Sequence, residues 1–292
     1  MSPNTTGALL MMASMAAFTL NDTLLKLTNG AVPLAQLLFL RGVLSSVLIY
    51  ALARSLGALR FRVARRDWGL IAIRAAAEVG AAYFFVTALL NMPLANVTAV
   101  LQALPLTVAF GAALVFREPL GWRRMSAILI GFMGMLLIVR PGVDGFSLWS
   151  GYALMAVLCV TLRDLATRRL SVHVPSMTVT LASSLAVTVS FGLASTLTDW
   201  VPVTLPLAAL IGAAAVFIIG GYFFSIRAMR VGEISFIAPF RYTGLVWALV
   251  LGWLVFGDWP TNLTLLGAGI VVATGLFTLY RERRVKERSM RP

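Results

Sequence analysis

Long apolar runs, separated by short polar or Gly/Pro breaks, follow one another along the chain. A helix needs about 20 mostly apolar residues to cross about 30 Å of hydrocarbon. Ten runs of this kind predict ten membrane-spanning helices; they lie at residues 7–27, 33–53, 69–90, 94–116, 122–139, 148–167, 175–197, 206–226, 234–256 and 261–280. The runs lack strict alternation of apolar and polar residues, so they predict helices and not the strands of a membrane barrel.

The composition supports this interpretation. Hydrophobic residues make up 60% of the chain and charged residues 12%, and the mean hydropathy is +0.90. Ordinary soluble domains have about a quarter of their residues charged. The first run is long, has no basic segment before it and contains Asn21 and Asp22, so we expect a retained span and not a cleaved signal peptide. We therefore predict an all-α, multi-pass integral membrane protein.

Basic residues between the runs are divided unevenly between the two sides of the predicted bundle. Eighteen lie on one side, and only Arg140 lies on the other. Cytoplasmic loops of membrane proteins accumulate Lys and Arg, so both termini are expected to be cytoplasmic, in a bacterial inner membrane. The net charge of +13 does not indicate nucleic-acid binding, because the charges lie in short segments and form no single basic face.

The chain repeats itself at long range. Three motifs return at offsets of 142, 139 and 140; they are Thr19–Asp22 with Thr161–Asp164, Tyr83–Phe85 with Tyr222–Phe224, and Leu114–Glu118 with Leu254–Asp258. Each half then holds five predicted spans. Because five is odd, the second half must enter the membrane from the opposite side, which predicts an inverted repeat.

This organisation divides the chain into three parts. The first repeat covers residues 7–142, the second covers 148–280, and a basic cytoplasmic tail covers 281–292. Secondary transporters commonly use inverted repeats and bind their substrate where the two repeats meet. The substrate site is therefore expected between the halves.

Charged residues inside the predicted spans are candidates for this site. They are Asp22, Lys26, Arg41, Arg74, Glu78, Arg163, Asp164 and Arg241. Each costs roughly 2.5–3.5 kcal/mol at a helix centre, so we expect these groups to face the bundle interior in pairs. By depth, Asp22 with Arg41 forms a candidate outer gate, and Asp164 with Arg241 or Arg74 forms a candidate inner gate. The alternative is static packing, with Lys26 extending to the interface.

Glu78 and several uncharged polar residues complete the polar set. Glu78 lies near the middle of its span and is a candidate proton carrier or substrate ligand. Pro105 and Pro239 each free a backbone carbonyl that a neighbour or cavity water must satisfy. Asn96 and Gln102 lie near the first of these prolines, and Ser235 and Arg241 lie at the equivalent positions near the second. We therefore expect both kinked helices to form cavity walls, with Arg241 as a further candidate for substrate binding. A kink that serves only packing is the alternative.

Aromatic residues of the spans are candidates for stacking on a planar substrate. Tyr83, Tyr222 and Trp247 form this set, and contact with lipid is the alternative for each of them. Small residues allow close helix approach and predict a scaffold or a dimer contact; they are Gly131, Gly134, Gly267 and Gly275.

Several classes of function are not expected. One histidine, His173, and one cysteine, Cys159, make a His/Cys metal site improbable, and no cofactor is expected. The chain has no G-x-x-x-x-G-K-[ST] run, so ATP hydrolysis at a phosphate-binding loop is not expected. Intramembrane hydrolysis needs a metal or an activated nucleophile, and neither is indicated. We therefore expect a protein that is not an enzyme.

A set of spaced residues resembles a known family. In the first half it comprises Asn21, Lys26, Pro33, Arg41, Ala88-Leu89, Pro105-Leu106, Glu118 and residues 140–142, and in the second Ala228, Asp258, Gly267 and Gly275. This set resembles the EamA type of the drug/metabolite transporter superfamily, which implies ten helices in two inverted five-helix repeats. The second half departs from the pattern where Thr243–Leu245 replaces the proline pair. Within the family, Phe18–Asp22 and Leu40–Gly42 resemble riboflavin-type and S-adenosylmethionine-type uptake carriers.

Together these features predict a secondary active transporter that moves a small organic metabolite across the inner membrane by alternating access. Riboflavin or another planar heteroaromatic is the favoured substrate, because the predicted interior is net positive and contains aromatic residues. An exporter of amino acids or of amphipathic metabolites and drugs, with the same fold, is the alternative. A non-transporting scaffold or a channel is a further class. We expect a monomer or homodimer, with the proton as candidate coupling ion.

Overall fold

The computed structural model describes the backbone of residues 2–55, 57, 59, 64–117, 122–139, 147–171, 173–231 and 234–289. Glu118, residues 140–142 and residues 290–292 lie outside this part of the chain. The helices are α1 (Pro3–Leu27), α2 (Leu34–Ser55), α3 (Arg65–Asn91), α4 (Leu94–Leu101), α5 (Leu104–Phe116), α6 (Trp122–Val139), α7 (Leu148–Arg168), α8 (Ser176–Ser195), α9 (Leu205–Val231), α10 (Ile234–Ile237), the 3₁₀ helix η1 (Ala238–Tyr242), α11 (Thr243–Phe256) and α12 (Asn262–Ser289). The predicted all-α class is confirmed for the described residues.

Eight segments of the described chain are long and apolar enough to cross a membrane, with α4 and α5 forming one segment and η1 with α11 another. Two more apolar stretches, Met125–Val139 in α6 and Asn262–Phe277 in α12, are shorter. These helices make the chain a multi-pass membrane protein. Every apolar run of the sequence coincides with one of these ten segments. That all ten cross the membrane stays a prediction.

The helix predicted over residues 94–116 is divided into α4 and α5. Pro105 has no N–H, and its ring excludes the carbonyl of Leu101, so the regular helical hydrogen bonds cannot pass this point. α4 accordingly ends at Leu101, and α5 begins at Leu104. Gln102 and Ala103 form the turn between them, where both N–H groups donate to carbonyls of the preceding turn. The predicted kink is therefore a break.

The helix predicted over residues 234–256 is divided in a similar way. α10 ends at Ile237, the 3₁₀ helix η1 contains Pro239 near its start, and α11 begins at Thr243. Proline is compatible with the first turn of a helical segment, where its missing N–H is not needed. Arg241 lies within η1. The two breaks thus place Gln102 and Arg241 at interruptions of regular helix.

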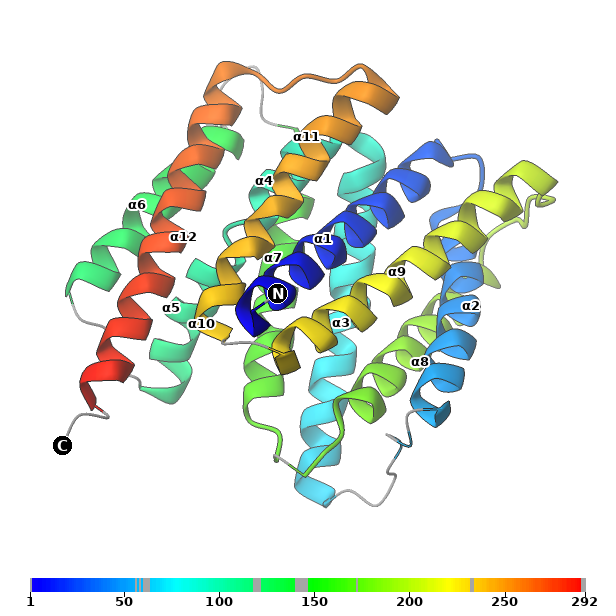
Figure 1. Ribbon diagram of the computed structural model, residues 1–292. Helices are drawn as coiled ribbons and strands as arrows, with labels where there is room; N and C mark the ends of the chain where they lie inside the picture. Colours follow the sequence, from blue (N-terminus) through cyan, green and yellow to red (C-terminus); the bar gives the residue numbers. More distant parts are fainter. Residues whose placement is uncertain are drawn as a thin grey trace.

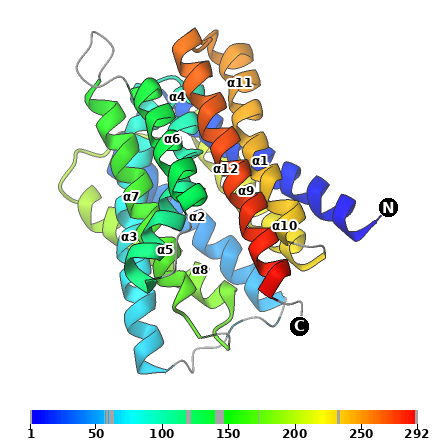
Figure 2. The ribbon, with the colours of Figure 1, turned by 90° about the vertical axis from the view of Figure 1, so that its left-hand side faces the viewer.

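Helices of the first half pack against helices of the second half. α1 packs on α9, α2 on α8, α3 on α7 and α6 on α12 (Figure 1), and the view in Figure 2 shows the α6–α12 pair from its outer side. Each pair is antiparallel; in the second pair Phe39 lies against Gly192 and Gly42 against Thr188. In the repeat, α1 corresponds to α7, α2 to α8, α3 to α9 and α6 to α12. Exchanging corresponding helices converts the α1–α9 pair into the α7–α3 pair and leaves the other two pairs unchanged. This is the contact pattern of two copies related by a two-fold axis.

One position of the last of the three sequence motifs has the same backbone conformation in both copies. Arg117 follows α5 and Gly257 follows α11, and both are left-handed, with φ of 54° and 69°. This conformation is free of strain for glycine, whereas it costs other residues roughly 1–2 kcal/mol. The repeat in sequence is at this point also a repeat in conformation.

Gly134 of α6 and Gly267 of α12 allow the backbones of these helices to touch. A Cβ atom at Gly267 would lie 2.5 Å from the carbonyl oxygen of Gly134, and one at Gly134 would lie 2.8 Å from Cγ2 of Ile270. Small residues permit this close approach in membrane helix pairs. These glycines therefore form a scaffold contact within one chain.

Candidate functional site

A cavity lies between α2, α3, α8 and α9. Its walls are formed by Arg41, Gly42, Ser45 and Ile49 of α2, Arg74, Glu78 and Ala82 of α3, Thr180, Ser183, Ser184 and Val187 of α8, and Ile218 and Tyr222 of α9. The space open to the centre of a water molecule is about 60 Å³. Because one bound water needs about 10–15 Å³ of such space, this conformation has room for a few waters or one small polar group.

Equivalent positions of the two halves face this cavity. At the offset of 142, Arg41, Gly42 and Ser45 of α2 correspond to Ser183, Ser184 and Val187 of α8, and all six line the cavity. Two lining residues of α3, four positions apart, face two of α9 with the same spacing. The cavity therefore lies where the two copies meet, which is the place that an inverted-repeat carrier uses for its substrate.

Tyr222 lines the cavity, whereas Tyr83 does not. Tyr222 packs edge-on against Phe18, with ring centroids 5.3 Å apart. Tyr83 is 40% exposed and contacts Tyr152. The two tyrosines match in sequence at an offset of 139, but Ala82 is the lining residue 140 positions before Tyr222. One residue turns a helix by about 100°, so the tyrosines of the two copies face different surroundings.

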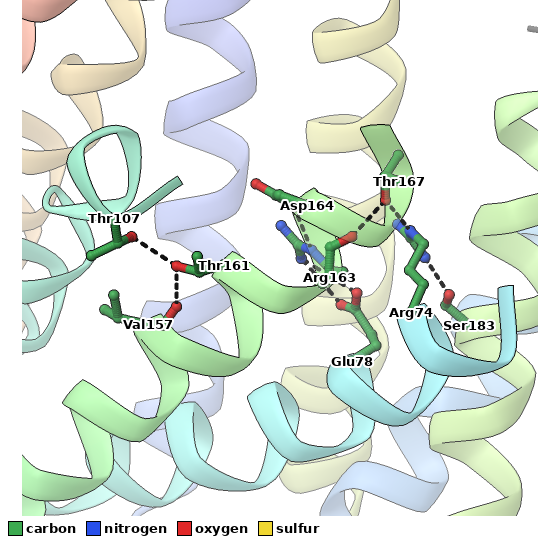
Figure 3. Close-up of polar contacts among 9 residues, drawn as sticks. All are labelled: Arg74, Glu78, Thr107, Val157, Thr161, Arg163, Asp164, Thr167 and Ser183. Atoms are coloured by element: carbon green, nitrogen blue, oxygen red, sulfur yellow. Dashed lines mark hydrogen bonds and ion pairs between the residues drawn. The ribbon is translucent and has the colours of Figure 1, made fainter. Parts of the chain in front are cut away.

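Arg163 of α7 connects two carboxylates, as Figure 3 shows. Its Nη1 lies 3.3 Å from Oε2 of Glu78, and its Nε donates to Oδ1 of Asp164 at 2.9 Å. The side chains are 22% exposed for Arg163, 20% for Glu78 and 35% for Asp164, so the three charges are mostly enclosed. A guanidinium has five N–H donors in a plane and can hold two carboxylates at once.

Arg74 extends this network towards α8. Its Nε donates to the Thr167 hydroxyl at 3.0 Å, and its Nη1 donates to the hydroxyl of Ser183 (Figure 3). Thr167 in turn donates to the backbone carbonyl of Arg163 at 2.7 Å. Arg74 and Glu78 are four residues apart and line the same cavity, as expected for one helix face. The partners that Arg74 contacts directly are hydroxyl groups.

Asn21 connects the two members of the predicted outer gate. Arg41 donates from Nη1 to Oδ1 of Asn21 at 3.5 Å, and Asn21 donates from Nδ2 to Oδ1 of Asp22 at 2.8 Å. At the offset of 142, Asn21 corresponds to Arg163, which donates to Asp164 in the same manner. Both copies thus hold the repeated aspartate through the residue that precedes it.

Asp164 forms its hydrogen bond with Arg163 and not with the predicted Arg241 or Arg74. Arg163 precedes Asp164 on the same helix, so this bond needs no alignment of two separate helices. Arg241 is an exposed residue of η1 and is attracted by the Asp164 carboxylate through space. Asp22 and Arg41 also attract each other through space. The gate roles of these four charged residues stay predictions.

Asn96, Gln102 and Trp247 lie on another pair of packed helices, α4 and α11, or in the turn after α4. The side-chain nitrogen of Gln102 approaches Gly244 at the start of α11. Oδ1 of Asn96 and Nε1 of Trp247 are buried and have no hydrogen-bond partner among the described residues. Buried polar atoms are normally paired, so a water or ligand atom would be stabilised beside each of them.

Lys26 has structural partners. Its Nζ donates to the carbonyls of Leu89 and Met92 at 3.1 and 2.9 Å, and it lies 5.4 Å from the centre of the Phe256 ring. A cation is stabilised at the C-terminal end of a helix, where carbonyls lack internal partners. Lys26 therefore joins the ends of α1, α3 and α11 and takes no part in the cavity.

No role was predicted for Arg163 from the sequence, although it was among the charged span residues, and two serines of the cavity were not singled out. Arg163 holds both carboxylates, and the available signal was that both copies of the motif have a hydrogen-bonding residue before aspartate. Ser45 and Ser183 line the cavity without a distinguishing sequence pattern. Serines also serve plain helix contacts, as Ser46 does with Ser184 at 2.8 Å, so the residue type alone does not separate the two uses.

A membrane bundle of two packed copies, with a charged cavity where they meet, has the construction of a polytopic transport protein. The model of the EamA-like transporter family matches residues 5–140 and, a second time, residues 147–280. The chain therefore belongs to the EamA-like transporter family, and it is a transporter and not an enzyme.

Relatives include uptake and export proteins. An S-adenosylmethionine uptake transporter of Rickettsia prowazekii (strain Madrid E) is 27% identical over 195 residues, 66% of this chain and 65% of that protein. A riboflavin transporter of Vibrio cholerae serotype O1 is 27% identical over 286 residues, 97% of this chain and 95% of that protein. The pseudopaline exporter CntI of Pseudomonas aeruginosa is 25% identical over 291 residues, 95% and 97% of the two chains. One solved crystal structure has a TM-score of 0.66 at 20% identity over 96% of this chain and 99% of that chain, which shows a common fold.

Proposed function

We propose that the protein is a secondary active transporter that moves a small organic metabolite across the bacterial inner membrane by alternating access. The observation that supports this most strongly is the charged cavity, which is lined by corresponding positions of the two copies. In carriers of this plan, the halves move against each other around a site between them. The cavity contains both cations and a carboxylate, so it can bind a polar group and a proton.

The proposed topology has ten spans in two inverted repeats, residues 7–142 and 148–280, with both termini and the tail 281–292 in the cytoplasm. Antiparallel packing of corresponding helices supports the inversion. The excess of basic residues on one side of the bundle supports the orientation. A cysteine placed in each loop and tested with a membrane-impermeant thiol reagent distinguishes the two sides.

Riboflavin or another planar heteroaromatic is the first proposed substrate. The edge-on pair of Tyr222 and Phe18 at the cavity and the riboflavin transporter among the relatives support it. The cavity has room for only a small group in the present conformation, so a heteroaromatic ring system requires a more open state. An exporter of amino acids or amphipathic metabolites is the second proposal, supported by the ionic network at the cavity and by the related pseudopaline exporter.

Transport by the purified protein in liposomes tests these proposals. With an imposed proton gradient, we expect labelled riboflavin to accumulate and unlabelled planar heteroaromatics to compete. Accumulation of amino acids without any effect of heteroaromatics would favour the second proposal. Absence of saturable counterflow for both classes would contradict transport of either and support a scaffold or channel.

Glu78→Gln is expected to abolish proton-driven accumulation and to leave substrate exchange at equal pH in place. The substitution removes the proposed proton-carrying carboxylate from the cavity, while Arg163 keeps its bond to Asp164. Accumulation and counterflow are measured in liposomes over a range of external pH. Counterflow by the variant should be independent of external pH, whereas counterflow by the wild-type protein should respond to it.

Asp164→Asn provides the matched control, because it removes the other carboxylate that Arg163 contacts. This variant is expected to retain the pH response. If Glu78→Gln keeps the same pH response as the wild-type protein, Glu78 has a structural role and the coupling proton binds elsewhere.

A further inference from the structure

The hydroxyl group of Ser45 lacks a hydrogen-bond partner in the cavity. Ser45 is 7% exposed and lines the cavity, yet its Oγ is buried without a partner among the described residues. A helical serine or threonine often donates to the carbonyl four residues earlier. Thr188 does so within α8, the helix that packs on α2, and its Oγ1 donates to the Ser184 carbonyl oxygen at 2.8 Å. A molecule bound in the cavity could therefore supply the acceptor that the Ser45 hydroxyl lacks.

Two guanidinium groups border the same cavity. Arg41 precedes Ser45 by four residues on α2, so both lie on one helix face, and the hydrogen bond from Arg41 to Asn21 is long at 3.5 Å. Arg74 donates to two hydroxyl groups. Neither arginine holds a carboxylate by a direct ion pair within the described chain, although each can donate five hydrogen bonds.

The carboxylates nearby are already committed. Glu78 faces the cavity, but Arg163 holds it at 3.3 Å and also holds Asp164. Arg41 is therefore left with an amide and Arg74 with hydroxyls as direct partners. The lining residues carry two positive charges and one negative charge, a net charge of +1, so a bound ligand with one negative charge makes the cavity neutral.

We propose that Arg41, Arg74 and Ser45 form a subsite for a carboxylate group of the transported molecule. Arginine binds a carboxylate with two parallel hydrogen bonds, and Ser45 can donate a third. The monoanion matches both the charge of the lining residues and the small volume of the cavity. This inference rests on the proposed transport function. Riboflavin has no carboxylate, so the subsite supports the second proposed substrate class, amino acids and amphipathic metabolites, over the first.

Thermal unfolding of the purified full-length protein in neutral detergent tests the subsite without requiring transport. The probes are benzoate and, as its uncharged analogue, benzamide, at constant ionic strength. The carboxylate occupies the subsite, and the ring requires the same more open state as a heteroaromatic substrate. We expect benzoate to raise the Tm in a saturable manner and benzamide to have no effect. Arg41→Gln and Arg74→Gln should each weaken benzoate binding about tenfold or more, because each removes charged hydrogen bonds. Ser45→Ala should weaken it by a smaller factor.

Arg227→Gln is the control for loss of a positive charge. Arg227 is an exposed residue of α9 over the Phe223 ring, and benzoate affinity should not change in this variant. Equal binding of benzamide, or an equal loss in Arg227→Gln, would contradict the subsite. If the arginine variants do not fold, unchanged benzoate affinity in Ser45→Ala would overturn it.

Two further probes distinguish other anions. If inorganic phosphate binds more tightly than benzoate, the subsite is one for a phosphate group and the carboxylate proposal is overturned. A stabilising effect of phosphatidylglycerol that is lost in Arg41→Gln, without a benzoate effect, would assign the site to a lipid headgroup. Benzoate binding by a protein that shows no transport in liposomes would contradict the proposed function and leave the subsite in place.

Discussion

Arg163→Gln should destabilise the protein more than removal of either carboxylate that Arg163 contacts. Glu78 and Asp164 share this guanidinium, and loss of the cation leaves both negative charges enclosed without their direct partner. Breaking a buried ion pair from one side typically costs about 3–5 kcal/mol. We expect a value near the lower end of this range, because Asp164 is 35% exposed. Unfolding in denaturant or the Tm in detergent measures the effect.

A second substitution and a control sharpen this prediction. Adding Glu78→Gln to Arg163→Gln should recover part of the lost stability, because one of the two unpaired charges is then removed. Arg169→Gln is the matched control, since Arg169 is exposed and donates to the Val115 carbonyl at 3.5 Å. Its effect should stay within about 0.5 kcal/mol. Equal effects of Arg163→Gln and Arg169→Gln would show that the shared guanidinium does not stabilise the bundle.

Gly267→Ala is expected to destabilise the bundle by about 1–3 kcal/mol, the usual cost of adding a methyl group to a filled contact. The new Cβ would lie 2.5 Å from the carbonyl oxygen of Gly134 and 2.8 Å from Cγ1 of Ile138. Since the nearest of these atoms belongs to the backbone of α6, the two helices must separate. The fall in Tm and the yield of folded protein in detergent measure this effect.

Gly269→Ala tests the same substitution two residues along α12. A Cβ at Gly269 would meet no atom within 4 Å, and this position is exposed. Both substitutions change the intrinsic helix preference equally, so their difference isolates the contact with α6. Equal stability of the two variants would mean that the α6–α12 contact adapts at no cost.

The helices were predictable because run length and apolarity decide which segments cross a membrane. The missing proline N–H predicted kinks near Pro105 and Pro239, where the structure has breaks. The 3₁₀ geometry of η1 was not predicted, because packing selects between helical forms. The repeat predicted local conformation well. Thr19 and Thr161, in the two copies of one motif, both donate to the carbonyl four residues earlier.

The partners of the charged residues were less predictable. Depth in the membrane placed Asp164 near Arg74 and Arg241, yet rotation about the helix axis and the residue next in sequence decided the bond to Arg163. Tyr83 illustrates the same limit. The repeated motif pairs Tyr83 with Tyr222 at an offset of 139, whereas the lining positions correspond at an offset of 140. This difference of one residue turns the side chain of Tyr83 to another face of its helix.

The contact between Ser46 and Thr188 has a consequence for kinetics. The two residues are corresponding positions at the offset of 142, and their hydroxyl oxygens lie 3.2 Å apart. In a carrier whose halves trade conformations, a bond between corresponding positions is the same in both end states. It contributes equally to the two minima and cancels from the equilibrium between them. Under the proposed alternating access, substitution at this pair is therefore expected to preserve the balance of inward-open and outward-open states, so that any effect on transport falls on the barrier between them, and hence on turnover.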